Sequence, residues 1–521
     1  MILKRTNRIA FTGLVLALGL GSCKEEHRQE QPNILIIMSD DHAVQAISAY
    51  GHPLSKIAPT PNIDRLAEQG AIFTANYCGN SICGPSRASI LTGKHSHKHG
   101  FMRNTAQGFD GSQQTLPKLL QENGYQTAII GKWHLVSEPT GFDFWKILND
   151  QGEYNNPDFI SDGDTVTHEG YVTDIITDLS IEWLNNRNNS NPFFLMMHHK
   201  APHRNWVPAS RHYDSFAETE FPVPGTYFDD YKGRQAAAHQ EMNIYRDMYE
   251  GHDLKMVEQE GSRNLLYDPW PHVWIDRMTE VQLKEFWDAY QPKADSYFKI
   301  NQKDEKAVAL WKLHRYMEDY LATVKSVDES VGQILDYLDK TGLAENTIVV
   351  YTSDQGFYLG EHGWFDKRFM YEESMLMPLL MRYPGFIEPG TVIDELTQNI
   401  DYAPAFLDFA GMEAPDDMQG VSFSNLLKKE IPMKWRNSLY YHYYEYPGFH
   451  SVRKHYGVRT HQYKLIHFYE DDDWELFDLE ADSLEMNNIY GMEGTGDIFK
   501  ELEQELRRLQ TIYEVPEEHI K

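Results

Sequence analysis

The residues with the clearest potential for chemistry lie in one short segment around a cysteine. The segment reads Cys83-Gly84-Pro85-Ser86-Arg87-Ala88-Ser89-Ile90-Leu91-Thr92-Gly93 and fits the pattern C-x-P-S-R-x-x-x-L-T-G at all seven specified positions. The short spacing from Cys78 also allows a disulfide or a pair of inert thiols. Those simpler interpretations account for neither Pro85 nor Arg87.

Polar residues follow four apolar segments that have the pattern of buried strands. The four segments are residues 32–38, 125–130, 193–197 and 347–351. Helical patterns such as 173–186 and 311–338 alternate with them, which predicts an α/β fold with a mainly parallel sheet. Ligand crevices in such sheets lie beyond the carboxyl ends of the strands. The residues predicted to surround one crevice are therefore Asp40, Asp41, Lys132, His134, His203 and Asp354.

Some of these strand-end residues could bind a metal ion. Asp40, Asp41 and Asp354, with the side-chain amide oxygen of Gln355, form an all-oxygen set. Such a set suits a hard divalent cation, with calcium favoured over magnesium or zinc. The alternative is that Asp40 caps a turn or a helix, which is common for a single aspartate and less so for a pair after a buried strand.

Three motifs together resemble the type I sulfatases of the alkaline-phosphatase-like superfamily. They are the Cys83 segment, Gly131-Lys132-Trp133-His134 and Ala201-Pro202-His203. The resemblance covers roughly residues 32–490 and implies a large, mainly parallel sheet flanked by helices, with a smaller C-terminal antiparallel subdomain. It also implies that a maturation enzyme oxidises Cys83 to formylglycine (3-oxoalanine), whose hydrate attacks the sulfur of a sulfate ester.

The resemblance assigns a role to each matching residue. It implies one calcium ion held by Asp40, Asp41, Asp354, Gln355 and the modified Cys83, although many family members carry asparagine or histidine in place of Gln355. Positive charge facing the sulfate would come from Arg87, Lys132 and Lys367. His203 would protonate the leaving sugar oxygen, and His134 would assist the elimination of sulfate.

A finer match concerns the substrate. Lys94 with its His-rich loop, and the segment 365–372, resemble the glucosamine-6-sulfatase branch. That branch implies exo-acting removal of 6-O-sulfate from N-acetylglucosamine in heparan sulfate, keratan sulfate or mucin glycans. Asp366 and Arg368 are the predicted contacts to sugar hydroxyls, and the alternative for them is a weak surface ion pair. His450 is a further candidate sugar contact, unless it packs under a loop.

Other functions stay open at this level. A phosphomonoesterase or phosphonate hydrolase of the same superfamily would use a serine or threonine nucleophile and add ligands for two zinc ions. A sulfatase for another sugar position would keep the catalytic motifs and change the sugar contacts. A non-catalytic protein that captures sulfated glycans would be expected to lose some motif residues, and this chain keeps them all.

The charge of the chain limits its partners. The 521 residues carry a formal net charge of −30, which argues against binding to nucleic acid and against adsorption to an anionic membrane surface. A sulfated glycan would be repelled by that average field, so its site must concentrate positive charge locally. The predicted partners are such a glycan and the maturation enzyme, with membrane contact only through a lipid anchor.

The beginning of the chain has the pattern of an export signal. Lys4, Arg5 and Arg8 precede an apolar stretch at residues 9–20 and the ending Leu20-Gly21-Ser22-Cys23. That ending resembles a bacterial lipobox, which predicts a signal peptide at 1–22 and a lipidated Cys23. Ordinary secretion is the alternative. The predicted protein is thus an exported lipoprotein of the periplasm or cell surface.

The rest of the chain divides into three predicted parts. Residues 23–31 are a polar tether, 32–400 a catalytic domain and 401–521 a smaller subdomain. The aromatic segment 267–290 could be an insertion that stacks on glycan rings, although aromatic residues more often belong to a core. A cluster of histidines between 95 and 99 reads as a pocket rim or a solvated loop.

Overall fold

The computed structural model describes Met1 and residues 31–521, except 105–106, 258–264, 267, 271–273 and 431–433. The predicted signal peptide, the lipidated Cys23 and all of the tether except Gln31 lie outside the described residues and stay predictions. Residues Gln31–Lys521 form one compact unit.

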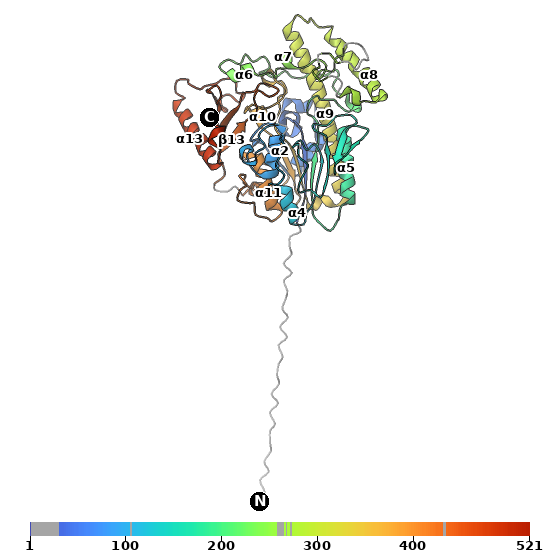
Figure 1. The fold of residues 1–521 in the computed structure, drawn as a ribbon, viewed down its shortest axis with the longest axis vertical. Coiled ribbons are helices and arrows are strands. Elements are labelled where there is room, and N and C mark those ends of the chain that lie inside the picture. Colours follow the sequence, from blue (N-terminus) through green and yellow to red (C-terminus); the bar gives the residue numbers. More distant parts are fainter. Residues whose placement is uncertain (2–30, 105–106, 258–264, 267, 271–273, 431–433) are drawn as a thin grey trace. The chain divides into compact units, whose positions relative to one another are not determined.

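Ten strands of the described chain form the large sheet predicted from the sequence (Figure 1). Its centre, β9-β1-β8-β4-β5, is parallel, and antiparallel strands flank it on both sides. The mainly parallel α/β fold is therefore confirmed. In order across the sheet, the strands are β11 (Thr391–Ile393), β2 (Ala71–Phe73), β10 (Leu379–Arg382), β9 (Thr347–Ser353), β1 (Asn33–Ser39), β8 (Phe193–His198), β4 (Gln126–Gly131), β5 (Phe144–Leu148), β6 (Asp158–Ser161) and β7 (Asp164–Thr167).

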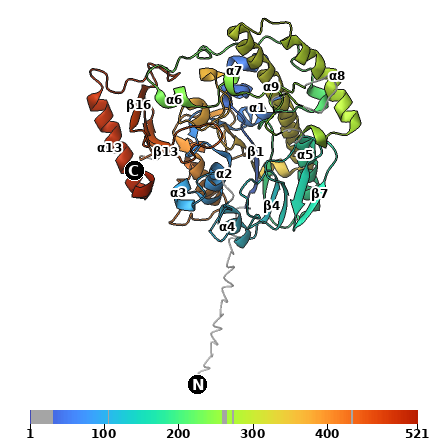
Figure 2. The same cartoon turned by 45° about the horizontal axis from the view of Figure 1, so that its top comes forward.

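Helices cover both faces of this sheet because its central strands are apolar on both sides. Along β1, Leu35 and Ile37 pack in one core with the first helix layer, whereas Ile34, Ile36 and Met38 pack in another with the second. Figures 1 and 2 show α5 with α9 on one side and α2 with α4 on the other. The first layer contains α1 (Pro61–Glu68), α5 (Val172–Asn186) and α9 (Glu305–Thr341), and the second contains α2 (Cys83–Thr92), α4 (Leu116–Glu122) and α11 (Tyr402–Phe409).

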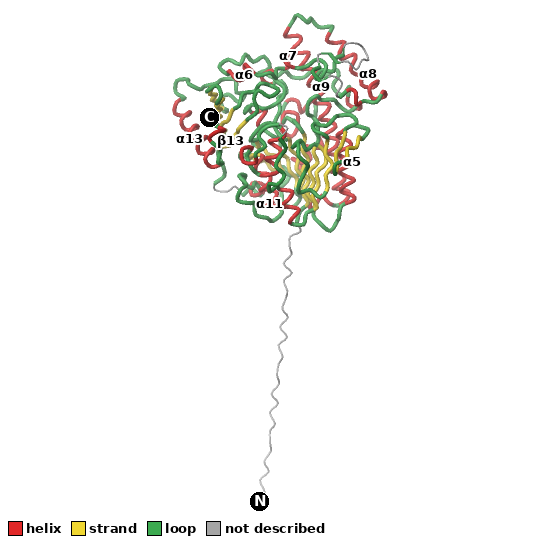
Figure 3. Tube along the Cα trace, in the orientation of Figure 1, coloured by secondary structure: helices red, strands yellow, loops and turns green. Residues whose placement is uncertain are grey.

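A separate antiparallel sheet of four strands lies near the C-terminus, as Figure 3 shows beside α13. On one face, residues such as Tyr440 and Leu465 pack against Leu506 of α13. On the other face, Tyr441 packs in a core with Trp364, which belongs to the loop after β9. Its elements are β13 (Ser438–Tyr443), β14 (His455–Thr460), β15 (Tyr463–Phe468), β16 (Asp473–Asp478) and α13 (Gly496–Ile512).

The smaller elements connect these layers. A two-stranded pair joins β3 (Asn76–Tyr77) to β12 (Thr397–Gln398). The domain boundary at residue 400 stays a prediction, although α11, just beyond it, contacts α2 and α4 of the large unit. The remaining α-helices are α3 (Ser96–His99), α6 (Gln235–His239), α7 (Ile244–Asp247), α8 (Glu280–Tyr297), α10 (Glu372–Met375) and α12 (Ser424–Leu427).

The structure bears on two of the sequence interpretations. Most of the described aromatic residues of segment 267–290 are core residues, since Trp274, Trp287 and Tyr290 are buried beside α5 and α9, while Tyr267 lies outside the described residues. The histidine cluster is not a solvated loop, because His95 is 3% exposed and its ring contacts Tyr513. No helix among the described residues is long and apolar enough to cross a membrane.

Candidate active site

Three aspartates meet where two neighbouring strands end. Strands β1 and β9 pair in parallel with Ser39 opposite Ser353, so Asp40 and Asp41 emerge beside Asp354. One carboxylate oxygen from each lies within 4.8 Å of the others, and all three side chains are buried. The backbone amide of Asp41 donates to Asp354 Oδ1 at 3.2 Å. The predicted convergence of these residues is therefore observed.

The donor atoms of this cluster fit a divalent cation. Among the described residues, Asp40 Oδ1 and the side-chain oxygen of Gln355 are buried without a hydrogen-bond partner. Burial raises the pKa of Asp41 to about 7 and that of Asp354 to about 6, because a buried carboxylate lacks solvation. A bound hard cation would coordinate the oxygens that have no partner and would favour the ionised form of both carboxyl groups.

Three positively charged side chains surround the same carboxylates. Lys367 Nζ lies 2.7 and 2.8 Å from the two oxygens of Asp41, and Lys132 Nζ donates to Asp40 Oδ2. Arg87 Nε donates to Asp354 Oδ2 at 3.0 Å. Although burial opposes ionisation of Asp40, Lys132 and the neighbouring cations hold the pKa of its carboxyl well below the usual range. An acidic protein thus gathers positive charge at one buried point, as predicted.

Cys83 is the first residue of α2 and faces the aspartate cluster. Its Sγ lies within 4.8 Å of ligand atoms of Asp40 and His203, and it is 1% exposed. Burial and the charge of Asp40 raise the pKa of the thiol well above its ordinary value, so an unmodified Cys83 is a neutral and weak nucleophile. Both Cys78 and Cys83 are free thiols, so the disulfide interpretation is wrong.

Two histidines flank the cluster. His203 follows β8, and its Nδ1 donates to the backbone oxygen of Arg204 at 2.7 Å, which leaves Nε2 facing Asp41 Oδ2 at 3.7 Å. His134 follows β4, and its Nε2 accepts from the side-chain amide of Gln151 at 2.8 Å. Burial holds the pKa of both imidazoles well below the ordinary value. Both rings therefore start neutral in the structure.

The predicted sugar contacts form a buried group beside Lys367. Asp366 Oδ1 accepts from Arg368 Nε at 2.9 Å, and Asp366 Oδ2 lies 3.2 Å from His450 Nε2. All three side chains are less than 10% exposed, so the surface ion-pair interpretation of Asp366 and Arg368 is wrong. His450 Nδ1 also donates to the backbone oxygen of Glu241 at 2.7 Å, which holds the loop that contains His450 against the segment that contains Glu241.

Sequence reasoning missed the residues that join this group to the cysteine. The side-chain oxygen of Asn104 accepts a hydrogen bond from the backbone amide of Gly84 at 3.0 Å. The backbone amide of Asn104 donates to Glu445 Oε2 at 3.0 Å. Glu445 Oε1 accepts from Arg368 Nη1 at 3.4 Å. A Cβ at position 84 would lie 2.5 Å from Phe101 Cε1 and 2.8 Å from Asn104 Oδ1, so a larger residue would displace these side chains. No motif or spacing marks Asn104, Glu445 or Gln151 in the sequence.

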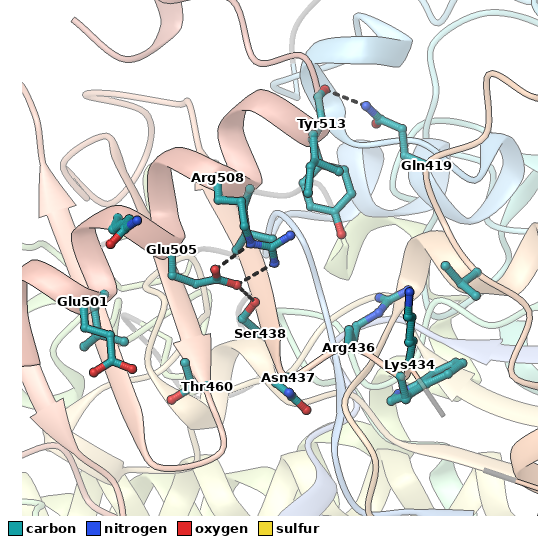
Figure 4. A pocket seen from close by; sticks show the side chains of 16 residues that line it. Gln419, Lys434, Arg436, Asn437, Ser438, Thr460, Glu501, Glu505, Arg508 and Tyr513 are labelled. Carbon is teal, nitrogen blue, oxygen red and sulfur yellow. Dashed lines mark hydrogen bonds and ion pairs between the residues drawn. The ribbon is translucent and has the colours of Figure 1, made fainter. Parts of the chain in front are cut away.

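A large surface cavity lies elsewhere (Figure 4). It has a volume of about 810 Å³ and is bounded by α13, by the start of β13 and by residues such as Gln419 and Tyr513. Its lining includes none of the residues predicted for the site, and its acidic Glu505 is paired with Arg508. The candidate active site is therefore the buried cluster at the strand ends and not this surface cavity.

Comparisons with known proteins identify the family of this chain. The family model described as Sulfatase matches residues 32–412, and the one described as N-sulphoglucosamine sulphohydrolase, C-terminal, matches residues 360–512. An N-acetylglucosamine-6-O-sulfatase of Bacteroides thetaiotaomicron is 51% identical over 511 residues, which cover 95% of this chain and 90% of the relative. The N-acetylglucosamine-6-sulfatase of Homo sapiens is 27% identical over 458 residues, or 82% of this chain and 71% of the relative.

A solved structure is also similar over nearly the whole chain. It is that of a protein in complex with its substrate D-glucosamine-2-N,6-O-disulfate, with a TM-score of 0.89, 50% identity, and coverage of 94% of this chain and 99% of that chain. The family model, the half-identical relative and the solved structure agree with one another. This chain belongs to the sulfatase family, whose members hydrolyse sulfate esters.

Proposed function

We propose that this sulfatase removes the 6-O-sulfate of an N-acetylglucosamine or glucosamine residue at the end of a glycan such as heparan sulfate, keratan sulfate or a mucin glycan. The observation that carries the proposal is the position of Lys367. It faces the aspartate cluster, while its chain neighbours Asp366 and Arg368 form the sugar-facing group with His450. The half-identical relative bears the name of that activity.

The reacting group we propose is formylglycine at position 83, made by a maturation enzyme. A neutral thiol is a poor nucleophile, whereas the hydrate of an aldehyde has two hydroxyl groups. One hydroxyl attacks sulfur as the ester oxygen leaves, and loss of a proton from the other expels sulfate and restores the aldehyde. One calcium ion, held by Asp40, Asp41, Asp354, Gln355 and the modified residue 83, would supply positive charge beside the reacting atoms.

The surrounding side chains do the remaining work. Lys132, Arg87 and Lys367 converge where the sulfate oxygens would lie, so they stabilise charge in the transition state. His203 presents Nε2 to the site, where it takes up the proton released by the attacking hydroxyl and passes it to the leaving sugar oxygen. A bound sulfate places negative charge beside this ring, which opposes the lowering of its pKa. His134 assists the elimination of sulfate.

The place of action is a further part of the proposal. The charged start, the apolar stretch at residues 9–20 and the ending at Cys23 support an exported lipoprotein of the periplasm or cell surface. Labelling cells with a lipid precursor and comparing the intact protein with Cys23→Ala tests this. Lipid incorporation only into the intact protein is expected, and equal release of both into the medium would contradict it.

The substrate test compares sulfated sugars that differ at one position. Protein from a maturation-competent host should release sulfate from N-acetylglucosamine 6-sulfate much faster than from N-acetylgalactosamine 6-sulfate or N-acetylglucosamine 3-sulfate. A peptide mass at residue 83 establishes formylglycine in the same sample. Release of sulfate only from another isomer would contradict the proposed substrate but would still show sulfatase activity. Faster turnover of an aryl phosphate than of any sulfate ester would favour the phosphatase alternative.

A further inference from the structure

Two aromatic side chains, one exposed and one partly buried, contact each other next to His450 of the predicted sugar contacts. Phe449 is 69% exposed, and its ring centroid lies 5.8 Å from that of Trp270, which is partly buried. We call this pair the outer shelf. Single exposed rings are common on protein surfaces, and this one is distinguished by its contact with Trp270 and by its place next to His450 in the chain.

The outer shelf is continuous with the sugar-facing group. The Arg204 guanidinium lies 5.9 Å from the ring of Trp270 and 5.0 Å from the ring of Phe365. Phe365 in turn lies 5.4 Å from His450, edge to face, and His450 contacts Asp366. One wall of contacts therefore leads from the predicted sugar ligands outward to the shelf.

The wall also borders the group that protonates the leaving oxygen. Arg204 directly follows His203, and its backbone oxygen accepts from His203 Nδ1 at 2.7 Å. The sugar that leaves the sulfate must lie on the His203 side of the cluster. The glycan chain attached to that sugar can therefore continue along this wall.

The support of the shelf is rigid. Arg204 makes two hydrogen bonds of 2.7 Å to Asp253, whose side chain is fully buried. Asp253 also accepts from the backbone amide of Tyr249 at 2.8 Å, and the guanidinium lies 5.2 Å from the Tyr249 ring. His252 lies 5.2 Å from Trp270. A preorganised platform loses little conformational entropy when a ligand binds.

We propose that the outer shelf binds the sugar residue linked to the sulfated one, through the apolar face of its ring. This rests on the proposed function. Aromatic rings provide a large apolar surface that suits the C–H face of a pyranose. A second sulfate is not the expected occupant, because Asp253 already engages the Arg204 guanidinium and the chain carries a net charge of −30.

The test compares a monosaccharide with a disaccharide. The substrates are N-acetylglucosamine 6-sulfate and a disaccharide with this residue at its non-reducing end, and the readout is the ratio of their kcat/KM values. Phe449→Ala and Trp270→Ala should each lower kcat/KM for the disaccharide about three- to tenfold and change that for the monosaccharide less than twofold. Phe298→Ala, at another ring that is 64% exposed, is the matched control and should change neither.

The outcomes separate the two proposals. If the intact protein releases no sulfate from either sugar, the proposed function fails and the shelf proposal fails with it. If sulfate is released and both variants keep the intact ratio, or lose activity equally on both sugars, only the shelf proposal is overturned. Calorimetry on a Cys83→Ala background, with and without Phe449→Ala, should show weaker disaccharide binding only, which separates binding from turnover.

Discussion

The aspartate cluster and the sugar-facing wall lie side by side but are built in different ways. Asp40, Asp41 and Asp354 directly follow adjacent parallel strands, whose pairing fixes their positions. Asp366 and Arg368 instead lie in the loop after β9, where both have left-handed backbone angles, with φ of 79° and 94°. Asp41 has such an angle too, with φ of 65°, but it follows the end of β1 by only two residues. Such conformations persist only when the surroundings hold them. The aspartates of the proposed metal site are therefore positioned mainly by strand pairing, whereas the predicted sugar contacts are positioned by the tertiary contacts of a loop.

That contrast predicts the largest effect at the cysteine of the sheet-side cluster. Cys83→Ala removes the reacting group, so sulfate release should fall by about 10⁴-fold or more while the melting temperature stays close to that of the intact protein. Cys78→Ala is the matched control, because Cys78 is equally buried and is also a free thiol. It should retain most activity. Comparable loss in both variants would indicate a packing defect and not lost chemistry.

Removal of the cation should have the next largest effect, and again on the sheet side. Treatment with a calcium chelator should lower activity by about 10²-fold or more, since the proposed ion offsets charge on the sulfate. It should also lower the melting temperature, because a ligand that binds only the folded state stabilises it. Calcium should restore both and zinc should not. Full activity after chelation, with metal absent by elemental analysis, would refute a calcium site.

The wall should control discrimination more than chemistry. Arg368→Ala leaves Asp366 buried without its guanidinium partner, so release from N-acetylglucosamine 6-sulfate should fall about 10²-fold. Release from a small aryl sulfate, which lacks sugar hydroxyls, should fall much less. The ratio of the two rates is the measurement. Equal losses on both substrates would place Arg368 in the catalytic machinery and erase the contrast between the regions.

The sequence predicts one region far better than the other for a physical reason. Apolar strands followed at once by Asp40, Lys132 or Asp354 are local patterns, and the rule for parallel sheets then brings their ends together. Asn104 and Glu445 are separated by 341 residues and meet through a single backbone hydrogen bond. Such a contact depends on how the segment after β13 packs on the segment between α3 and α4, and this packing has no periodic signature in the sequence. The aromatic segment around Trp287 was ambiguous for the same reason, since composition alone does not show whether its side chains pack against other helices or face solvent.

The link between the two regions gives a smaller and sharper prediction. Asn104→Ala removes the acceptor of the Gly84 amide and should lower kcat about tenfold with little change in KM, because it positions the helix that begins at Cys83. Glu445→Gln should weaken the Arg368 contact and raise KM instead. Formylglycine content must be measured in each variant, since a shifted cysteine segment could also lower maturation. An unchanged kcat at equal formylglycine content would remove Asn104 from the positioning role.

The support behind the wall should affect stability and leave activity nearly unchanged. Tyr371 lies at the end of the loop that carries Asp366 and Arg368, which we call the wall loop, and its hydroxyl donates to Glu475 of β16 at 2.7 Å. Burial raises the pKa of Glu475 from 4.5 to about 8. The folded protein thus keeps this proton at a pH where the unfolded chain has released it. Its contribution to stability is complete below about pH 4.5, declines as the pH rises, and is lost above about pH 8.

Chemical unfolding between pH 5 and pH 9 tests this sign. The free energy of unfolding of the intact protein should fall over that range, with Glu475 contributing on the order of 1–3 kcal/mol of the change. Glu475→Gln is neutral at every pH and should flatten the dependence, while Glu501→Gln, at an exposed position on α13, should not. Identical slopes for the intact protein and Glu475→Gln would mean that Glu475 is ionised in the folded state. Activity per folded molecule should change less than twofold in either variant. Glu475 contacts the wall loop through Tyr371, and none of the interactions described for it involves the aspartate cluster.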